Sequence, residues 1–175
     1  MIHIYTGNGK GKTTASFGLA MRASGHGLKS IIFQFFKPEG LISGEEISAN
    51  RLKNIKVKKC KEGHPMFKSS CGGKVLIKRV KKAIKEMMED VKKSILSKGY
   101  DIVILDEIIN VLDQNFYSKK EFIKILKDAP SSVDIILTGR GDISMLENYA
   151  DYITIMVDKK HPFRSGVVAK KGIEY

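Results

Sequence analysis

A glycine-rich segment near the start of the chain has the residue types and spacing of a phosphate-binding loop. Residues 6–14 have the sequence TGNGKGKTT and directly follow an apolar run at residues 2–5. Glycines let successive backbone N–H groups converge on phosphate oxygens, and the helix that follows directs its positive end toward them. Lys12 would add a mobile positive charge in an exposed cradle, and Thr13 would supply a hydroxyl to Mg²⁺. The segment therefore predicts a binding site for a nucleoside triphosphate.

One position of this segment departs from the usual spacing of a phosphate-binding loop. Four residues normally separate the first glycine from the Gly–Lys pair, but that position is Thr6 here and Gly7 lies one place later. We therefore expect a tighter loop than usual. The alternative is a glycine turn that merely joins a strand to a helix, and the Lys-Thr-Thr ending at residues 12–14 argues against it.

Two carboxylates follow a second apolar run. Residues 102–105 have the sequence IVIL, and Asp106 and Glu107 come directly after them. Phosphate-loop proteins bring an acidic side chain toward Mg²⁺ or its waters in this way, so both acids are candidate metal ligands. Side chains alternate along a strand, so we expect only one of the two to contact the ion directly. The alternative is a strand that ends in two solvated acids.

Arg140 follows a third apolar run, at residues 133–137. The carboxyl ends of parallel strands meet at one edge of a sheet, so this guanidinium is expected beside the glycine-rich loop, where it could hold a phosphate or a carboxylate. Arg22 is a weaker candidate. We interpret His26 and His64 as structural or exposed histidines.

The intervening segments predict the elements that position these groups. Strand patterns cover residues 2–5, 29–36, 55–58, 101–106, 133–137 and 152–157, and helical patterns cover residues 13–24, 45–52, 119–127 and 142–149. An apolar stripe from Leu76 to Ile95 predicts a longer helix with lysines on its other face, and Ser118 has capping-box spacing to Glu121. Residues 60–73 lack periodicity and are predicted to form a functional loop. Alternating strands and helices indicate an α/β fold with a mostly parallel sheet covered on both faces.

Length, composition and charge restrict the class of protein. The 175 residues, 42% of them hydrophobic, suit a single domain over residues 1–175. Apolar runs too short for a bilayer, and the lack of a leader before the first strand, predict a cytoplasmic protein without a membrane association. The net charge of +12 would attract nucleic acid, acidic membranes or polyphosphates. We interpret the lysine-rich stretches as a solvated face, because no aromatic residues for base stacking accompany them. Cys60 and Cys71 lack the close pairing of a zinc site and are interpreted as reduced thiols.

Several of these motifs together resemble the ATP:corrinoid adenosyltransferase family. The matching segments are residues 6–15, 17–23, 25–27, 34–35 with 37, 105–108 with 110, 137–141, and 160–163 with 166, 169 and 171–175. The resemblance implies a P-loop NTPase-like (RecA-like) fold. It also implies transfer of the 5′-deoxyadenosyl group of ATP to the Co(I) of a reduced corrinoid, with release of triphosphate, in cobalamin biosynthesis or salvage. In that family ATP lies in the reverse of the usual phosphate-loop orientation, so that its 5′ carbon faces the corrinoid.

The resemblance assigns roles to residues of this chain by position. It implies that Lys12 and Glu107 are catalytic residues and that Thr13 and Glu107 bind Mg²⁺ directly. Asp106 is also implied as a metal-site residue, next to these direct ligands. The residues implied in ATP binding are Gly7, Asn8, Gly9, Lys10, Gly11, Lys12, Thr13, Thr14 and Arg140. The substrate would be a corrinoid of the cobalamin, cobinamide or cobyric acid a,c-diamide type. A homodimer and a flavoprotein reductant are further implications of the family.

The chain departs from the family in the loop before the long helix. Family members use aromatic side chains there to exclude water from Co(I) and to weaken its lower axial ligand, but this chain has no Trp. Phe67 is the nearest substitute and is the candidate on the corrinoid side. Two alternative functions stay open: a P-loop ATPase or phosphotransferase that cleaves at the γ-phosphate, and a nucleic-acid-binding ATPase suggested by the positive charge.

Overall fold

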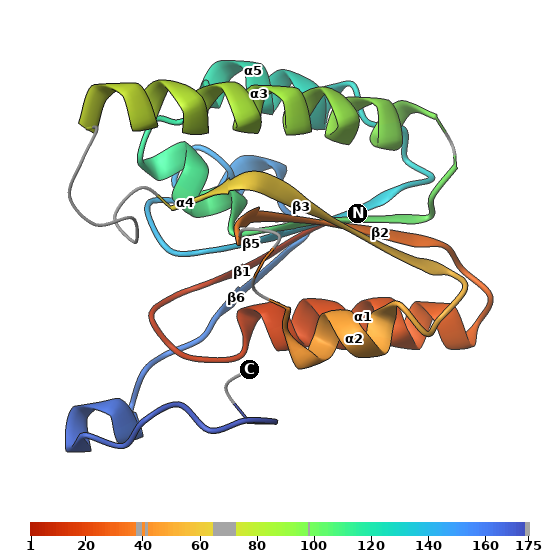
Figure 1. The fold of residues 1–175 in the computed structure, drawn as a ribbon. Coiled ribbons are helices and arrows are strands. Elements are labelled where there is room, and N and C mark those ends of the chain that lie inside the picture. Colours follow the sequence, from red (N-terminus) through yellow and green to blue (C-terminus); the bar gives the residue numbers. More distant parts are fainter. Residues whose placement is uncertain (38–39, 41, 65–72, 98, 174–175) are drawn as a thin grey trace.

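The fold is a parallel sheet between two layers of helices (Figure 1). The structure is a computed structural model and describes residues 1–37, 40, 42–64, 73–97 and 99–173, without the side chains of residues 163 and 164. Within the described residues six strands lie in the order β3-β2-β4-β5-β1-β6, and every neighbouring pair is parallel. The strands are β1 (Ile2–Thr6), β2 (Ser30–Phe36), β3 (Ile55–Gly63), β4 (Ile102–Asp106), β5 (Asp134–Thr138) and β6 (Tyr152–Ile155).

Helices cover both faces of this sheet. On one face lie α1 (Lys12–Gly25) and α2 (Gly44–Ala49), and on the other lie α3 (Gly73–Leu96), α4 (Ile108–Asp113) and α5 (Lys119–Lys127) (Figure 1). Two short 3-10 helices, Glu147–Tyr149 and Pro162–Ser165, follow β5 and β6. The α/β prediction with helices on both faces is therefore confirmed. None of the helices in the described part of the chain is long and apolar enough to cross a membrane.

The core forms two clusters, one on each side of the sheet. The larger lies beneath α3, α4 and α5 and includes Ile84 and Val91 from α3. The smaller lies beneath α1 and α2 and includes Phe17 and Ile104. Helix α3 buries one stripe of residues three or four positions apart and leaves its lysines in water, as its periodicity predicts. Ser118 caps α5 as expected, since its Oγ accepts a hydrogen bond from the Glu121 N–H.

Two predicted boundaries are wrong. The segment expected to be a loop over residues 60–73 begins as strand, because β3 continues to Gly63 and buries Cys60 between α3 and the sheet. Residues 65–72, which include Phe67 and Cys71, lie outside the described residues. The helix expected over residues 142–149 is reduced to the 3-10 turn at Glu147–Tyr149. The hydrogen bonds of this segment close tight single turns, because the Leu146 and Glu147 N–H groups share the Ile143 carbonyl oxygen and the Tyr149 N–H donates to the Leu146 carbonyl oxygen.

Truncating the core stripe of α3 is expected to destabilise the fold. Ile84 is fully buried, so Ile84→Ala should lower the free energy of unfolding by about 2–5 kcal/mol through lost burial and a cavity. Urea denaturation followed by circular dichroism measures this. The neighbouring exposed residue provides the control: Lys85→Ala should change the value by less than about 0.5 kcal/mol. Equal losses in both variants would contradict the assignment of the buried face.

Candidate functional site

The turn from β1 into α1 has a shape that only glycine fits at two positions. Gly7 has φ 97°, and a Cβ added there would lie 2.4 Å from the Met156 carbonyl oxygen. A Cβ on Gly9 would lie 2.7 Å from the same oxygen, and the Gly9 N–H donates to it at 2.7 Å. Thr6, where a usual loop has its first glycine, is the last residue of β1. The loop therefore packs directly against the backbone that follows β6.

Lys12 is folded into this loop. Its side chain donates from Nζ to the carbonyl oxygens of Gly7 and Gly9, both at 2.7 Å, and the residue is only 6% exposed. The expectation of an exposed lysine is therefore wrong, because the ammonium group is bonded to the carbonyl oxygens of the loop. Burial is the main cause that lowers the pKa of Lys12, and the charge of Arg140 lowers it further. Phosphate oxygens would offer the ammonium group stronger, charge-assisted hydrogen bonds than these carbonyls.

Asp106 is the centre of the polar network beside the loop. Its carboxylate is fully buried and accepts hydrogen bonds from four side chains. Asp106 Oδ1 accepts from Thr13 Oγ1 at 2.9 Å and from Thr138 Oγ1 at 2.7 Å. Asp106 Oδ2 accepts from Gln34 Nε2 at 3.1 Å and from Lys37 Nζ at 2.9 Å. The Lys37 contact is an ion pair. Four donors around one buried carboxylate satisfy its oxygen atoms and fix its orientation.

Glu107 begins α4 from a left-handed backbone conformation, with φ 69°. Strand β4 ends at Asp106, so the alternation of side chains along a strand does not describe this pair of acids. The Glu107 N–H donates to Thr138 Oγ1 at 3.0 Å, which ties the turn to β5. Burial is the main cause that raises the pKa of the Glu107 carboxyl, and the negative charge of Asp106 adds to it. The positive charges of Lys37, Lys12 and Arg140 act in the opposite direction and lower the pKa of the Glu107 carboxyl.

Arg140 lies at the same edge, after β5. Its backbone N–H donates to the side-chain oxygen of Asn110 on α4 at 2.7 Å, while its side chain is exposed. Its positive charge lowers the pKa of both Lys12 and Glu107. Three sequence-predicted segments, at residues 7–14, 106–107 and 139–141, therefore meet at the carboxyl edge of the sheet.

The remaining candidates lie away from this cluster. Arg22 and His26 are exposed at the end of α1. The His64 ring contacts Phe36 and Phe116, and its Nε2 is 2.8 Å from Gln114 Oε1. Burial raises the pKa of the Cys60 thiol. These contacts agree with structural roles for these residues.

Three residues of the Asp106 network had no role assigned from the sequence: Gln34, Lys37 and Thr138. Each lies at or just after the carboxyl end of β2 or β5, the two strands that flank β4. Their position at these strand ends could have identified them from the sequence, because side chains at the carboxyl ends of neighbouring parallel strands converge.

The oxygen donors at this edge suit a Mg²⁺ ion. The Thr13 hydroxyl and two carboxylates are hard ligands, and Thr13 Oγ1 lies 2.9 Å from Asp106 Oδ1. Among the described residues no group of three or more His, Cys, Asp or Glu side chains could hold a metal by itself. Mg²⁺ commonly binds one or two protein ligands together with substrate phosphates. The residues present therefore fit an ion that arrives with a nucleotide.

Comparison with known proteins agrees with this geometry. Residues 1–175 match the family described as ATP:corrinoid adenosyltransferase BtuR/CobO/CobP. The chain belongs to the ATP:corrinoid adenosyltransferase family. The family resemblance and the P-loop NTPase-like fold predicted from the motifs are thereby confirmed.

Curated relatives of this adenosyltransferase family match over the whole chain. The corrinoid adenosyltransferase of Escherichia coli (strain K12) is 31% identical over 175 residues, which cover 100% of this chain and 85% of that protein. The corrinoid adenosyltransferase of a Sinorhizobium species is 30% identical over 182 residues, with 100% and 80% covered. The corrinoid adenosyltransferase CobA of Salmonella typhimurium (strain LT2) is 30% identical over 175 residues, with 100% and 85% covered.

Neutralising Glu107 is expected to stabilise the protein when no divalent ion is present. The folded chain holds the Glu107 proton more tightly than the unfolded chain, whose pKa is near 4.5. The wild type therefore loses stability as the pH rises from that value through the raised pKa. Glu107→Gln removes this loss, so its melting temperature in EDTA should exceed that of the wild type at pH 7 and match it near pH 4. Glu89→Gln, an exposed acid on α3, is the control. A lower melting temperature for Glu107→Gln at pH 7 would contradict the expected cost of burying this charge.

Proposed function

We propose that the protein transfers the 5′-deoxyadenosyl group of ATP to the Co(I) of a reduced corrinoid. In this reaction the cobalt electron pair attacks the ribose 5′ carbon, and a Co–C bond forms as the bond from C5′ to the α-phosphate oxygen breaks. Triphosphate leaves with that electron pair, and the cobalt becomes formally Co(III). The observation that carries the proposal is the match of the whole chain to the ATP:corrinoid adenosyltransferase family.

The charges at the loop suit the departure of triphosphate. The whole triphosphate gains charge when the bond to C5′ breaks, so the protein must stabilise that charge more strongly in the transition state than in bound ATP. Lys12 and Arg140 can bind phosphate oxygens, together with backbone N–H groups of the loop. Lys12 would exchange the Gly7 and Gly9 carbonyl oxygens for these phosphate oxygens.

The residues around Asp106 suit a Mg²⁺ ion bound with the phosphates. In this proposal Thr13 and Glu107 hold the ion, and Asp106 orients the Thr13 hydroxyl through their hydrogen bond. Asp106 already accepts four hydrogen bonds, which favours a supporting role over direct coordination. The ion would neutralise charge on the triphosphate.

The setting of the reaction is inferred from the family resemblance. We infer a single domain that works in the cytoplasm as a homodimer and receives electrons from a flavoprotein reductant. The substrate would be cobalamin or one of its precursors.

An anaerobic assay tests the proposed reaction. The protein is incubated with ATP, Mg²⁺ and chemically reduced cob(I)alamin, and the absorbance change and phosphate products are followed. Adenosylcobalamin and triphosphate in equal amounts would support the proposal. ADP and phosphate without adenosylcobalamin would favour the ATPase or phosphotransferase alternative, and stimulation of that hydrolysis by RNA or DNA would favour a nucleic-acid-dependent ATPase.

Removing the Lys12 charge is expected to slow adenosyl transfer. Lys12→Ala should lower kcat/KM by roughly 10²–10³, the usual cost of losing one preorganised donor to a developing anion. The anaerobic assay measures the rate, and circular dichroism checks that the fold persists. Lys85→Ala, an exposed lysine on α3, should keep the wild-type rate. Normal turnover by Lys12→Ala would refute the assigned role.

Replacing Phe67 is expected to affect corrinoids unequally. If Phe67 helps to displace the lower axial ligand, Phe67→Ala should reduce kcat/KM for cob(I)alamin more than for cob(I)inamide, which lacks that ligand. Parallel kinetic assays with both corrinoids measure the ratio. An equal reduction for the two would indicate that Phe67 has no part in displacing the ligand.

A further inference from the structure

Strand β2 turns at its last residue. Before that point its side chains alternate between the two faces of the sheet, since Ile31, Phe33 and Phe35 belong to the larger core cluster and Ile32 belongs to the smaller one. Phe36 breaks this alternation, because it also packs against the larger cluster. Its backbone φ is 59°, in the left-handed region that a bulky residue rarely adopts. The turn therefore returns the residue after Phe36 to the face of Ile32.

This turn brings two side chains to one carboxylate oxygen. Gln34 Nε2 and Lys37 Nζ both donate to Asp106 Oδ2, at 3.1 Å and 2.9 Å. Residues three positions apart on a regular strand point to opposite faces, so the left-handed residue between them is what allows both to reach this oxygen. The pairing of β2 with β3 is also irregular between Gln34 and Phe36. Irregularities of this kind re-aim side chains at the ends of strands.

Aromatic contacts hold Phe36 in this conformation. Its ring packs edge to face against His64, with ring centroids 4.6 Å apart, and against Phe116, with centroids 5.5 Å apart. These contacts connect the end of β2 to the residue after β3 and to the segment after α4. Glycine would adopt the same φ without strain but could make neither contact. The ring at residue 36 therefore fixes the direction in which the chain leaves β2.

Lys37 lies beside two oxygen atoms of the proposed metal site. Its ion pair joins a side chain that is 31% exposed to the fully buried Asp106 carboxylate. Lys37 Nζ also lies 3.5 Å from Thr13 Oγ1, and the Thr13 hydroxyl donates to Asp106. A positive charge held at this position opposes the approach of a second cation to the same carboxylate.

We propose that Lys37 is a built-in counter-ion that keeps Asp106 from binding a free divalent cation, and that the turn at Phe36 positions it. Mg²⁺ then depends on ligands that arrive with the substrate, because Thr13 and Glu107 leave most of its octahedral positions to water or phosphate. This inference rests on the Mg²⁺ ion of the proposed function and deepens it. It makes Phe36 a positioning residue that acts through Lys37.

Binding of a divalent ion without nucleotide tests the role of Lys37. Mn²⁺ takes the same oxygen ligands as Mg²⁺, and electron paramagnetic resonance of the free ion measures how much is bound. Lys37→Met removes the charge from a side chain of similar length, so this variant should bind Mn²⁺ at least about ten-fold more tightly than the wild type at pH 8. Damage to the site would weaken binding instead. Unchanged or weaker binding by the folded variant would overturn the proposal.

A second lysine–aspartate ion pair provides a matched control. Lys58 Nζ lies 2.8 Å from Asp90 Oδ2, outside the Asp106 network. Lys58→Met removes the same charge, but salt screens distant charges, so its Mn²⁺ affinity should stay within about two-fold of the wild type. Equal tightening in both variants would indicate an effect of net charge and would overturn the assignment to Lys37.

A further variant tests the turn while every charge is kept. Phe36→Gly permits the left-handed conformation but removes the ring, so Lys37 should be held less firmly and Mn²⁺ should bind at least about three-fold more tightly. Asn115, with φ 56°, is the control, and Asn115→Gly should bind Mn²⁺ like the wild type. Wild-type affinity in folded Phe36→Gly would overturn the positioning role. If circular dichroism shows that Lys37→Met does not fold, Phe36→Gly decides the proposal.

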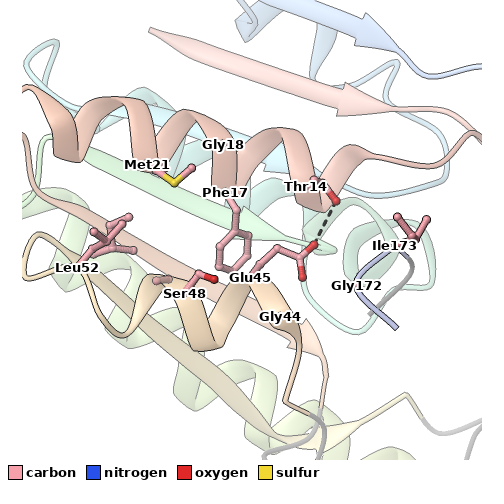
Figure 2. Close-up of a pocket in the computed structure, with 12 residues that line it drawn as sticks. Thr14, Phe17, Gly18, Met21, Gly44, Glu45, Ser48, Leu52, Gly172 and Ile173 are labelled. Atoms are coloured by element: carbon pink, nitrogen blue, oxygen red, sulfur yellow. Dashed lines mark hydrogen bonds between the residues drawn. The ribbon is translucent and has the colours of Figure 1, made fainter. Parts of the chain in front are cut away.

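These titrations contain neither ATP nor corrinoid, so their outcome is independent of whether adenosyl transfer is observed. The altered residues also do not line the groove between α1 and α2, a cavity of about 470 Å³ that opens beside Thr14 (Figure 2). Phe17 and Met21 of α1 and Glu45 and Ser48 of α2 line that groove. A change in Mn²⁺ binding can therefore be assigned to the Asp106 side of the loop.

Discussion

The buried carboxylate of Asp106 is the interaction on which the site depends. An ionised group without contact with water is stable only when its lone pairs are satisfied, and here four side chains satisfy them. The donors come from the start of α1, from the end of β2 and the residue after it, and from the end of β5. One group therefore sets the distance between the phosphate-binding loop and three strand ends. Glu107 follows Asp106 directly, and its N–H shares the Thr138 hydroxyl, so its position derives from the same network.

The two flanks of the phosphate-binding loop differ in how much free space lies beside them. On the β6 side the Met156 carbonyl lies so close that glycine is required at residues 7 and 9. On the α2 side the surface opens into an apolar groove that begins at Thr14. The free space beside the loop therefore lies on its α2 side. In an adenosyl transfer the reacting atom is the 5′ carbon, so the protein has to keep that atom accessible while it binds the departing triphosphate.

Much of this arrangement was predictable from the sequence, because short-range patterns determine it. The apolar runs before Gly7, Asp106 and Arg140 indicate parallel strands, and the carboxyl ends of such strands must meet. Helix α4 was not predicted because four of its six residues are buried, so it has no amphipathic period. The helix expected over residues 142–149 is reduced to tight turns, a difference in hydrogen bonding that the apolar pattern does not reveal.

The features that sequence could not predict arise from contacts between distant segments. The inward position of Lys12 depends on the Gly7 and Gly9 carbonyl oxygens, to which its Nζ donates. The groove depends on α1, α2 and residues 172–173, which no local pattern brings together. Resemblance to the family supplied the reaction, whereas residue patterns alone indicated only a nucleotide site.

The order of the strands also affects how the protein acquires its shape during synthesis. Strand β1 is synthesised before the other five strands, yet its partners are β5 and β6, and Ile2 aligns with Ile135 while His3 aligns with Tyr152. A parallel pairing over so many residues is slow, because a long loop must close before any contact compensates for the lost entropy. Strand β1 therefore remains without its sheet neighbours until β5 and β6 have been synthesised. We expect the phosphate-binding loop, which directly follows β1, to reach its final position only late in folding.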